Sequence, residues 1–132
     1  MPNNNNNKLA LMELMGIEYS GISGQAAIDK LLKEKQGHVK DAFYRDDIGG
    51  IDIYWGDEKS GICHIIKERK DRGMSGKKFV DDLTDVIEKG KSFQGKESDR
   101  MNIAYKGKVA VITFELYNTE VTALLTAFHT KK

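Results

Sequence analysis

The chain has 132 residues, of which 39% are hydrophobic and 31% charged, with a single proline and a single cysteine, Cys63. This composition predicts one ordered domain, and the lone cysteine excludes an internal disulfide or a cysteine-rich zinc site, so the fold must hold in a reducing compartment. The net charge of +1 counts mildly against a non-specific nucleic-acid binder, and no apolar run of the ~20 residues needed to span a bilayer and no signal peptide is present.

Residues 1–7 contain a run of five asparagines and are expected to be a disordered linker or tag remnant, with residues 8–132 forming a single domain. Apolar spacing predicts the elements that follow. In chain order they are a helix over 8–15, a helix over 25–36, a strand over 51–55, helices over 60–70 and 75–89, and strands over 91–94, 101–105, 108–116 and 121–129. Helices that precede an antiparallel sheet predict an α+β fold.

Individual residues set the expected faces and ends of these helices. In the first helix, Leu9, Met12 and Leu11 are expected to face inward. Ser23 is the expected N-cap of the second helix, and Gly37 is its stop. The last helix has the clearest pattern, because one apolar stripe runs along it as far as Gly90.

No motif of fixed spacing identifies an enzyme in this sequence. A P-loop, an H-E-x-x-H motif and paired cysteines are absent, and the spacing of His38, His64 and His129 matches no common zinc site, so neither a metal nor a cofactor is expected. His64 is the best single candidate for chemistry. It lies on the predicted helix over 60–70, where Lys67 at i+3 and Glu68 at i+4 can share its face.

A histidine near cations suits the cleavage of RNA. The 2′-hydroxyl must lose a proton as it attacks phosphorus, and the leaving 5′-oxygen must gain one, which a histidine can achieve near neutral pH. Basic and hydroxyl side chains can stabilise the phosphorane without a metal. The basic cluster of Lys67, Arg69, Lys70 and Arg72 can seat a phosphate backbone on an otherwise near-neutral protein.

Each of these residues also has a structural interpretation. His64 can be a helix residue packed under the sheet with its ring bonded to a carbonyl, and spacing alone favours this interpretation. The basic cluster can be a solvated helix face, and Arg100 can pair with Asp99 or Glu97. Thr126 suits a strand through β-branching alone.

Three successive segments resemble a known family. They are residues 37–43 (GHVKDAF), 48–56 (IGGIDIYWG) and 61–66 (GICHII). The helix that ends at Gly90 and the position of Arg100 ahead of a hairpin that closes in residues 124–128 follow the same order. The sequence is similar, over most of residues 25–129, to the barnase–EndoU–colicin–RelE-like endoribonuclease toxin domains found in phage-associated and polymorphic bacterial toxins.

The resemblance implies N-terminal helices followed by a four- or five-stranded antiparallel sheet, one face of which binds RNA and cleaves it without a metal. His64 matches the family's helix histidine, Arg100 an arginine before the central hairpin, and Thr126 a hydroxyl residue on the last strand. Lys67 lies where the family often has a basic residue or histidine. Residues 68–70 replace the more usual histidine-ended helix, which leaves the second proton-transfer group open.

The sequence therefore predicts a metal-independent endoribonuclease toxin module that leaves a 2′,3′-cyclic phosphate. The candidate catalytic residues are His64, Lys67, Arg100 and Thr126, and the candidate substrate-binding residues are Lys40, Arg45, Arg69, Lys70 and Tyr105, the last of which can stack a base if exposed. The family implies tRNA or another structured RNA as substrate, and an acidic immunity protein or antitoxin as partner. The domain is expected to act in the bacterial cytoplasm, delivered as the C-terminal part of a larger secreted or phage-associated protein. The alternative is a non-catalytic RNA- or protein-binding module of a phage or surface protein with the same fold.

Overall fold

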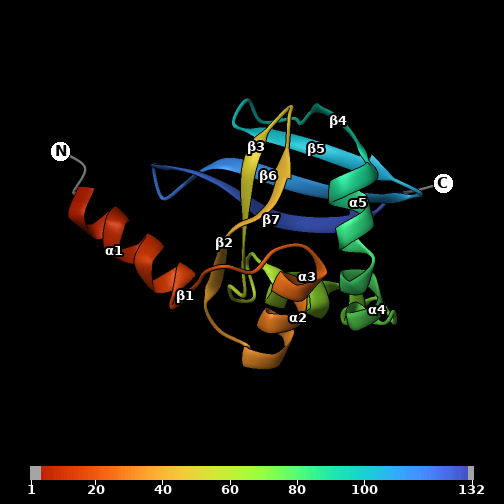
Figure 1. The fold of residues 1–132 in the computed structure, drawn as a ribbon, viewed down its shortest axis with the longest axis horizontal. Helices are drawn as coiled ribbons and strands as arrows, with labels where there is room; N and C mark the ends of the chain where they lie inside the picture. The colour runs from red at the N-terminus through yellow and green to blue at the C-terminus, as the bar shows by residue number, and fades with distance from the viewer. Residues whose placement is uncertain (1–3, 131–132) are drawn as a thin grey trace.

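A computed structural model describes residues 4–130 and shows helices packed on a seven-stranded sheet (Figure 1). In chain order the elements are α1 (Asn4–Met15), β1 (Glu18–Tyr19), α2 (Gln25–Glu34), β2 (His38–Arg45), β3 (Gly49–Tyr54), α3 (Ile62–Asp71), α4 (Gly76–Asp81), α5 (Leu83–Lys89), β4 (Lys91–Gln94), β5 (Arg100–Tyr105), β6 (Lys108–Leu116) and β7 (Thr119–His129). Within residues 4–130, no helix is both long enough and apolar enough to cross a membrane.

The sheet is mixed, with the strand order β1-β2-β3-β7-β6-β5-β4. β1 runs parallel to β2 and β3 parallel to β7, whereas the other neighbours are antiparallel. The α+β prediction is confirmed, but the expectation of four or five antiparallel strands that follow all the helices is wrong. The β2–β3 hairpin lies between α2 and α3 in the chain, and β7 inserts beside β3, which joins two antiparallel groups into one larger sheet.

The apolar pattern of the sequence did not predict strand β2, because a bulge interrupts the strand. Its register with β3 shifts between Val39 and Phe43, and Asp41 within the shift has a positive φ of 51°. The residues after the bulge therefore lose the simple alternation that predicts a strand.

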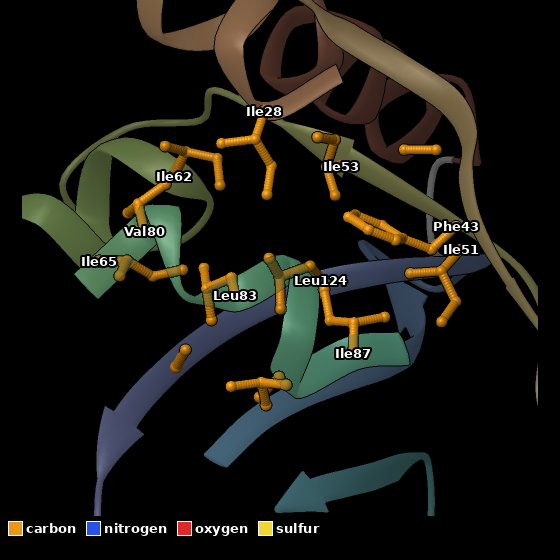
Figure 2. Packing of buried hydrophobic residues seen from close by; sticks show 14 of the residues in the cluster. Ile28, Phe43, Ile51, Ile53, Ile62, Ile65, Val80, Leu83, Ile87 and Leu124 are labelled. Atoms are coloured by element: carbon orange, nitrogen blue, oxygen red, sulfur yellow. The ribbon is translucent and has the colours of Figure 1, made fainter. Parts of the chain in front are cut away.

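The main core lies between one face of the sheet and helices α2 to α5. Four helices contribute to one cluster with strand residues (Figure 2): Ile28 of α2, Ile62 and Ile65 of α3, Val80 of α4, and Leu83 and Ile87 of α5. The strand side of the cluster comprises Val39, Ala42, Phe43, Ile51, Ile53, Ile103, Ala110, Ile112, Leu124 and Ala127. Burial of these side chains is the main source of the fold's stability, at about 1.5–3 kcal/mol for each large apolar side chain.

Helix α1 differs from its prediction in extent and in face. It begins at Asn4, so residues 4–7 are helical where a linker was expected, and residues 1–3 lie outside the described residues. Extending a helix past an existing turn costs little, which allows even asparagines to continue it. Leu9 and Met12 are 55% and 62% exposed, and Met15 is the buried contact, packed with Tyr54 and Ala123.

Two other helix predictions are corrected in detail. Gly24 rather than Ser23 is the N-cap of α2, and it adopts a positive φ of 61° while its amide donates to the Ala42 carbonyl. The single helix expected over 75–89 is divided at Asp82, whose carboxylate pairs with Lys108. The division still leaves the apolar stripe of both helices facing the core.

Candidate active site

Strand pairing identifies which side chains share the face of the sheet that points away from the main core, which we call the outer face. Because Ile103, Ala110 and Ala127 form a cross-strand row within the core, the residues that alternate with them lie on the outer face. One row there runs across four strands through Asp52, Ala123, Thr113 and Arg100, and the next contains Thr126, Val111 and Asn102. Arg100 and Thr126 therefore lie on one face.

His64 is the third residue of α3, and two backbone hydrogen bonds fix the start of that helix. The Gly61 amide donates to the Leu125 carbonyl at 2.9 Å, and the Cys63 amide donates to the Trp55 carbonyl at 2.8 Å. Leu125 is the extra residue of a bulge in β7, because Thr126 pairs with Val111 while Leu124 pairs with the adjacent Ile112. The bulge places the first turn of α3 beside the strand segment that carries Thr126.

A hydrogen bond selects one tautomer of the neutral His64 ring. Its Nδ1 lies 2.7 Å from the Glu58 carbonyl oxygen, and because a carbonyl can only accept, Nδ1 is the donor. In the neutral ring Nε2 then carries the lone pair and can take a proton. The bond to a carbonyl matches the structural interpretation of His64, but the ring is half-buried rather than packed in the core.

Arg100 begins β5 and is half-buried. Its Nε is buried without a hydrogen-bond partner, and no ion pair within residues 4–130 joins it to Asp99 or Glu97. The alternative of a local ion pair is therefore wrong. A guanidinium with unused donors on the outer face can bind an anion.

The predicted basic cluster does not form one surface. Lys67 is exposed and pairs with Asp71 at 3.1 Å, a contact that raises the pKa of Lys67. Lys70 is exposed as expected. Arg69, in contrast, is only 4% exposed and lies among core residues, because it shares the buried stripe of α3 with Ile62 and Ile65.

Two other substrate-binding candidates have internal roles. The Arg45 guanidinium donates to both carboxylate oxygens of Asp47 and to the carbonyls of Ile87 and Gly90 at the end of α5. Tyr105 packs against the main core, on the side of β5 opposite Arg100, with Lys106 over its ring. We leave both residues out of the candidate site.

The remaining candidate, Lys40, lies at a hollow that the sequence did not indicate. The hollow has a volume of about 330 Å³ and is lined by Lys40, Asp41, Gly50, Asp52, Glu120, Val121 and Thr122. The Asp41 amide donates to Asp52 Oδ1 at 2.7 Å, and burial raises the pKa of Asp52. Asp52 was overlooked because, between Ile51 and Ile53, it looks like an ordinary solvent-facing strand residue.

The structure therefore brings some candidates together and separates others. Arg100 and Thr126 share the outer face, whereas His64 lies on α3, which packs on the core face, and only the start of that helix is bonded to the strand of Thr126. Within the described residues, no hydrogen bond links the side chains of these three. No group of three or more histidine, cysteine or acidic side chains among residues 4–130 is arranged to hold a metal ion.

Comparison with known proteins places this arrangement in a family. The family model described as phage-Barnase-EndoU-ColicinE5/D-RelE like nuclease 1 matches residues 42–132, which is more than half of the chain and contains His64, Arg100 and Thr126. No curated protein matches the sequence. The matched region contains α3 and every strand from β3 to β7. The chain therefore belongs to the phage-Barnase-EndoU-ColicinE5/D-RelE like nuclease 1 family.

Proposed function

We propose that this nuclease-family domain is a metal-independent endoribonuclease and that His64 moves a proton during cleavage. The observation that carries the proposal is the 2.7 Å hydrogen bond from His64 Nδ1 to the Glu58 carbonyl. This bond leaves Nε2 as a base, on a helix whose start is bonded to β7. Family membership supports a nucleic acid as the substrate.

The proposed reaction begins when His64 Nε2 accepts the proton of a ribose 2′-hydroxyl. The 2′-oxygen attacks the adjacent phosphorus, the bond to the 5′-oxygen breaks, and a 2′,3′-cyclic phosphate is formed. Arg100 and the Thr126 hydroxyl would donate hydrogen bonds to the phosphorane oxygens, where negative charge accumulates. Lys67, which pairs with Asp71, would place a cation one helical turn from His64.

The leaving 5′-oxygen needs a proton from a second group, and we propose Asp52 for this role. Asp52 lies on the outer face at the opposite end of the row from Arg100, ~14 Å across the sheet, and its pKa is raised because burial disfavours the carboxylate. A carboxyl with a raised pKa retains its proton at a higher pH than an exposed one, which suits it to act as an acid.

The biological setting follows from the same proposal. A ribonuclease endangers the cell that makes it, so we propose a toxin module that acts on tRNA or another structured RNA in the bacterial cytoplasm. It would be delivered by a larger secreted or phage-associated protein and held inactive by an acidic immunity protein or antitoxin. The exposed cations at the end of α3, chiefly Lys70 and the cap residue Arg72, support an acidic partner.

The decisive experiment follows end-labelled RNA in excess EDTA. Wild-type protein should release fragments that end in 2′,3′-cyclic phosphate and should not cleave DNA of the same sequence, which lacks the 2′-hydroxyl. Removal of His64 as a base should lower the rate by ~10²-fold or more.

A matched pair of variants separates catalysis from structure. His64→Ala removes the whole ring, whereas His64→Asn keeps an N–H that can bond to the Glu58 carbonyl but has no basic nitrogen. Both should be inactive and folded. An active His64→Asn would reduce His64 to a structural role. Cleavage that needs magnesium and leaves 3′-hydroxyl ends would indicate a metal-bound water, and RNA binding without cleavage would identify a non-catalytic RNA-binding domain.

A further inference from the structure

In the part of the chain that the structure describes, Arg69 is a buried cation without a carboxylate partner. It is 4% exposed, and no ion pair of the described residues includes it. Its guanidinium lies 5.3 Å from the centre of the Phe79 ring, and its Nε is buried without a hydrogen-bond partner. Because burying a charge is costly unless it is compensated, this position calls for a nearby anion.

Among residues 4–130, the one side-chain hydrogen bond of Arg69 goes to His129. Arg69 Nη1 lies 3.1 Å from His129 Nδ1, and since a guanidinium has only donors, Nδ1 must accept. His129 is therefore neutral, and its proton is on Nε2. Burial, together with the charges of Arg69 and Lys108, lowers the pKa of His129 and favours this state. The ring keeps an N–H donor that Arg69 does not use.

His129 lines a hollow of about 250 Å³ between α4 and the ends of β6 and β7. Its polar lining consists of Ser75, Lys78, Asp82, Lys108 and His129, and its apolar lining includes Phe79. Lys108 pairs with Asp82 at 3.4 Å, whereas Lys78 is exposed and has no ion pair among the described residues. The hollow and its surroundings therefore contain three cations, Lys78, Lys108 and the adjacent Arg69. The only carboxylate among the described residues that line the hollow is that of Asp82, so the local net charge is +2.

We propose that this hollow binds a phosphate group, held by the side chains of Lys78 and Lys108 and by the Nε2–H of His129. A phosphate group carries up to two negative charges, which match the local surplus, and its several acceptor oxygens suit a set of converging donors. Arg69 acts as a positioning residue: it fixes the His129 tautomer and adds charge behind the ring.

The source of the phosphate follows from the course of α3, a step that rests on the proposed ribonuclease function. The helix lies beside β7 from Gly61, which bonds to Leu125, to Arg69, which bonds to His129. Eight helical residues span ~12 Å, so the hollow lies about that far along the same strand from the start of α3. An RNA chain cleaved near His64 can therefore place a neighbouring phosphate in the hollow. The alternative source is a free phosphate ion.

The test titrates the 132-residue chain with inorganic phosphate and follows the His129 ring by NMR. Lys78→Met removes one proposed contact, and Lys77→Met is its matched control. Lys77 is the adjacent exposed lysine, lies outside the hollow and pairs with Asp81. Phosphate should shift the His129 signals, and Lys78→Met should weaken phosphate binding about tenfold, as expected for a lost charge-assisted contact, while Lys77→Met leaves it unchanged.

A second arm identifies the source with a single-stranded RNA whose 2′-hydroxyls are methylated, which prevents cleavage. If RNA supplies the phosphate, Lys78→Met weakens RNA binding more than Lys77→Met, and inorganic phosphate competes with RNA. Equal RNA affinity of the two variants, with phosphate binding still sensitive to Lys78, overturns the RNA source and supports a free-phosphate site. If phosphate does not shift the His129 signals, or if both variants bind it equally, the hollow is not a phosphate site. Both arms measure binding and neither needs cleavage. If the proposed reaction is wrong, the protein fails to cleave RNA, but phosphate binding remains sensitive to Lys78→Met.

Discussion

The change Gly61→Ala tests whether the start of α3 positions the active site. Gly61 has a φ of 90° and a ψ of −171°, a conformation open almost only to glycine, and forcing alanine into it costs about 1–3 kcal/mol. An added Cβ would also lie 2.8 Å from the Trp55 carbonyl oxygen and 2.9 Å from the Tyr54 ring. That carbonyl cannot move freely because it accepts from Cys63, so overpacking adds about 1–3 kcal/mol.

Gly73→Ala is the matched control. Gly73 also has a positive φ, of 76°, but nothing lies within 4 Å of an added Cβ, so only conformational strain of about 1–2 kcal/mol is expected. The two penalties at Gly61 predict a loss of about 2–6 kcal/mol in the free energy of unfolding. Urea denaturation of both variants measures the difference.

Activity gives the second readout of Gly61→Ala. His64 follows three residues later, so a displaced first turn would move Nε2 away from the proposed RNA substrate. At a temperature where both variants are folded, Gly61→Ala should cleave RNA ~10²-fold more slowly, because an error of about 1 Å in placement costs that much. Gly73→Ala should cleave normally. Equal stability and equal activity of the two variants would refute the assigned role of this helix start.

Three further predictions concern the charged groups. Asp52→Asn should remove the limb of the pH–rate profile that reports the acid and lower the rate by ~10²-fold, whereas an unchanged profile would exclude Asp52 from proton transfer. Reversing the charges of Lys70 and Arg72 should weaken both RNA cleavage and inhibitor binding. Both losses should become smaller as the salt concentration is raised, because salt screens exposed charges. A loss of cleavage alone would indicate an inhibitor that binds elsewhere. Because the folded-state pKa of His129 lies below its usual 6.5, the unfolded chain binds more protons, so wild-type stability should fall as pH drops below about 6.5. Urea denaturation at a series of pH values should show a weaker decline for His129→Gln, and identical curves would contradict this origin.

The strands from β4 to β7 could be predicted from the sequence, because the alternation of apolar and polar residues within each strand determines their bounds. Strands β4 and β6 have the predicted bounds, and β5 and β7 differ from theirs by one or two residues at one end. Alternating residues and tight turns, including the one that contains Gly107, are properties of neighbouring residues. The insertion of β7 beside β3 was not predictable, because it depends on pairing Asp52 with Ala123, which are far apart in the chain.

The positions of the candidate residues in the fold were predicted in part for the same reason. Helical spacing was enough to place His64 near the start of a helix, and the resemblance added Arg100 and Thr126. Arg69 was expected to be exposed because it is an arginine. Its position indicated the opposite, since it lies four residues after Ile65 and therefore on the buried stripe of α3. The internal bonds of Arg45 depend on the end of α5, which lies more than forty residues away in the chain, so no local pattern shows them.

The single register pair between β3 and β7 has a consequence for how the protein is made. During synthesis the β2–β3 hairpin and α3 are completed before β7. However, β7 is the central strand of the sheet and joins the β1-β2-β3 group to the β6-β5-β4 group. Contacts between segments so far apart form slowly, after the local hairpins. The segment with His64 and the strands with Arg100 and Thr126 therefore meet only when the chain has been synthesised through β7. An incomplete chain would thus lack the proposed active site.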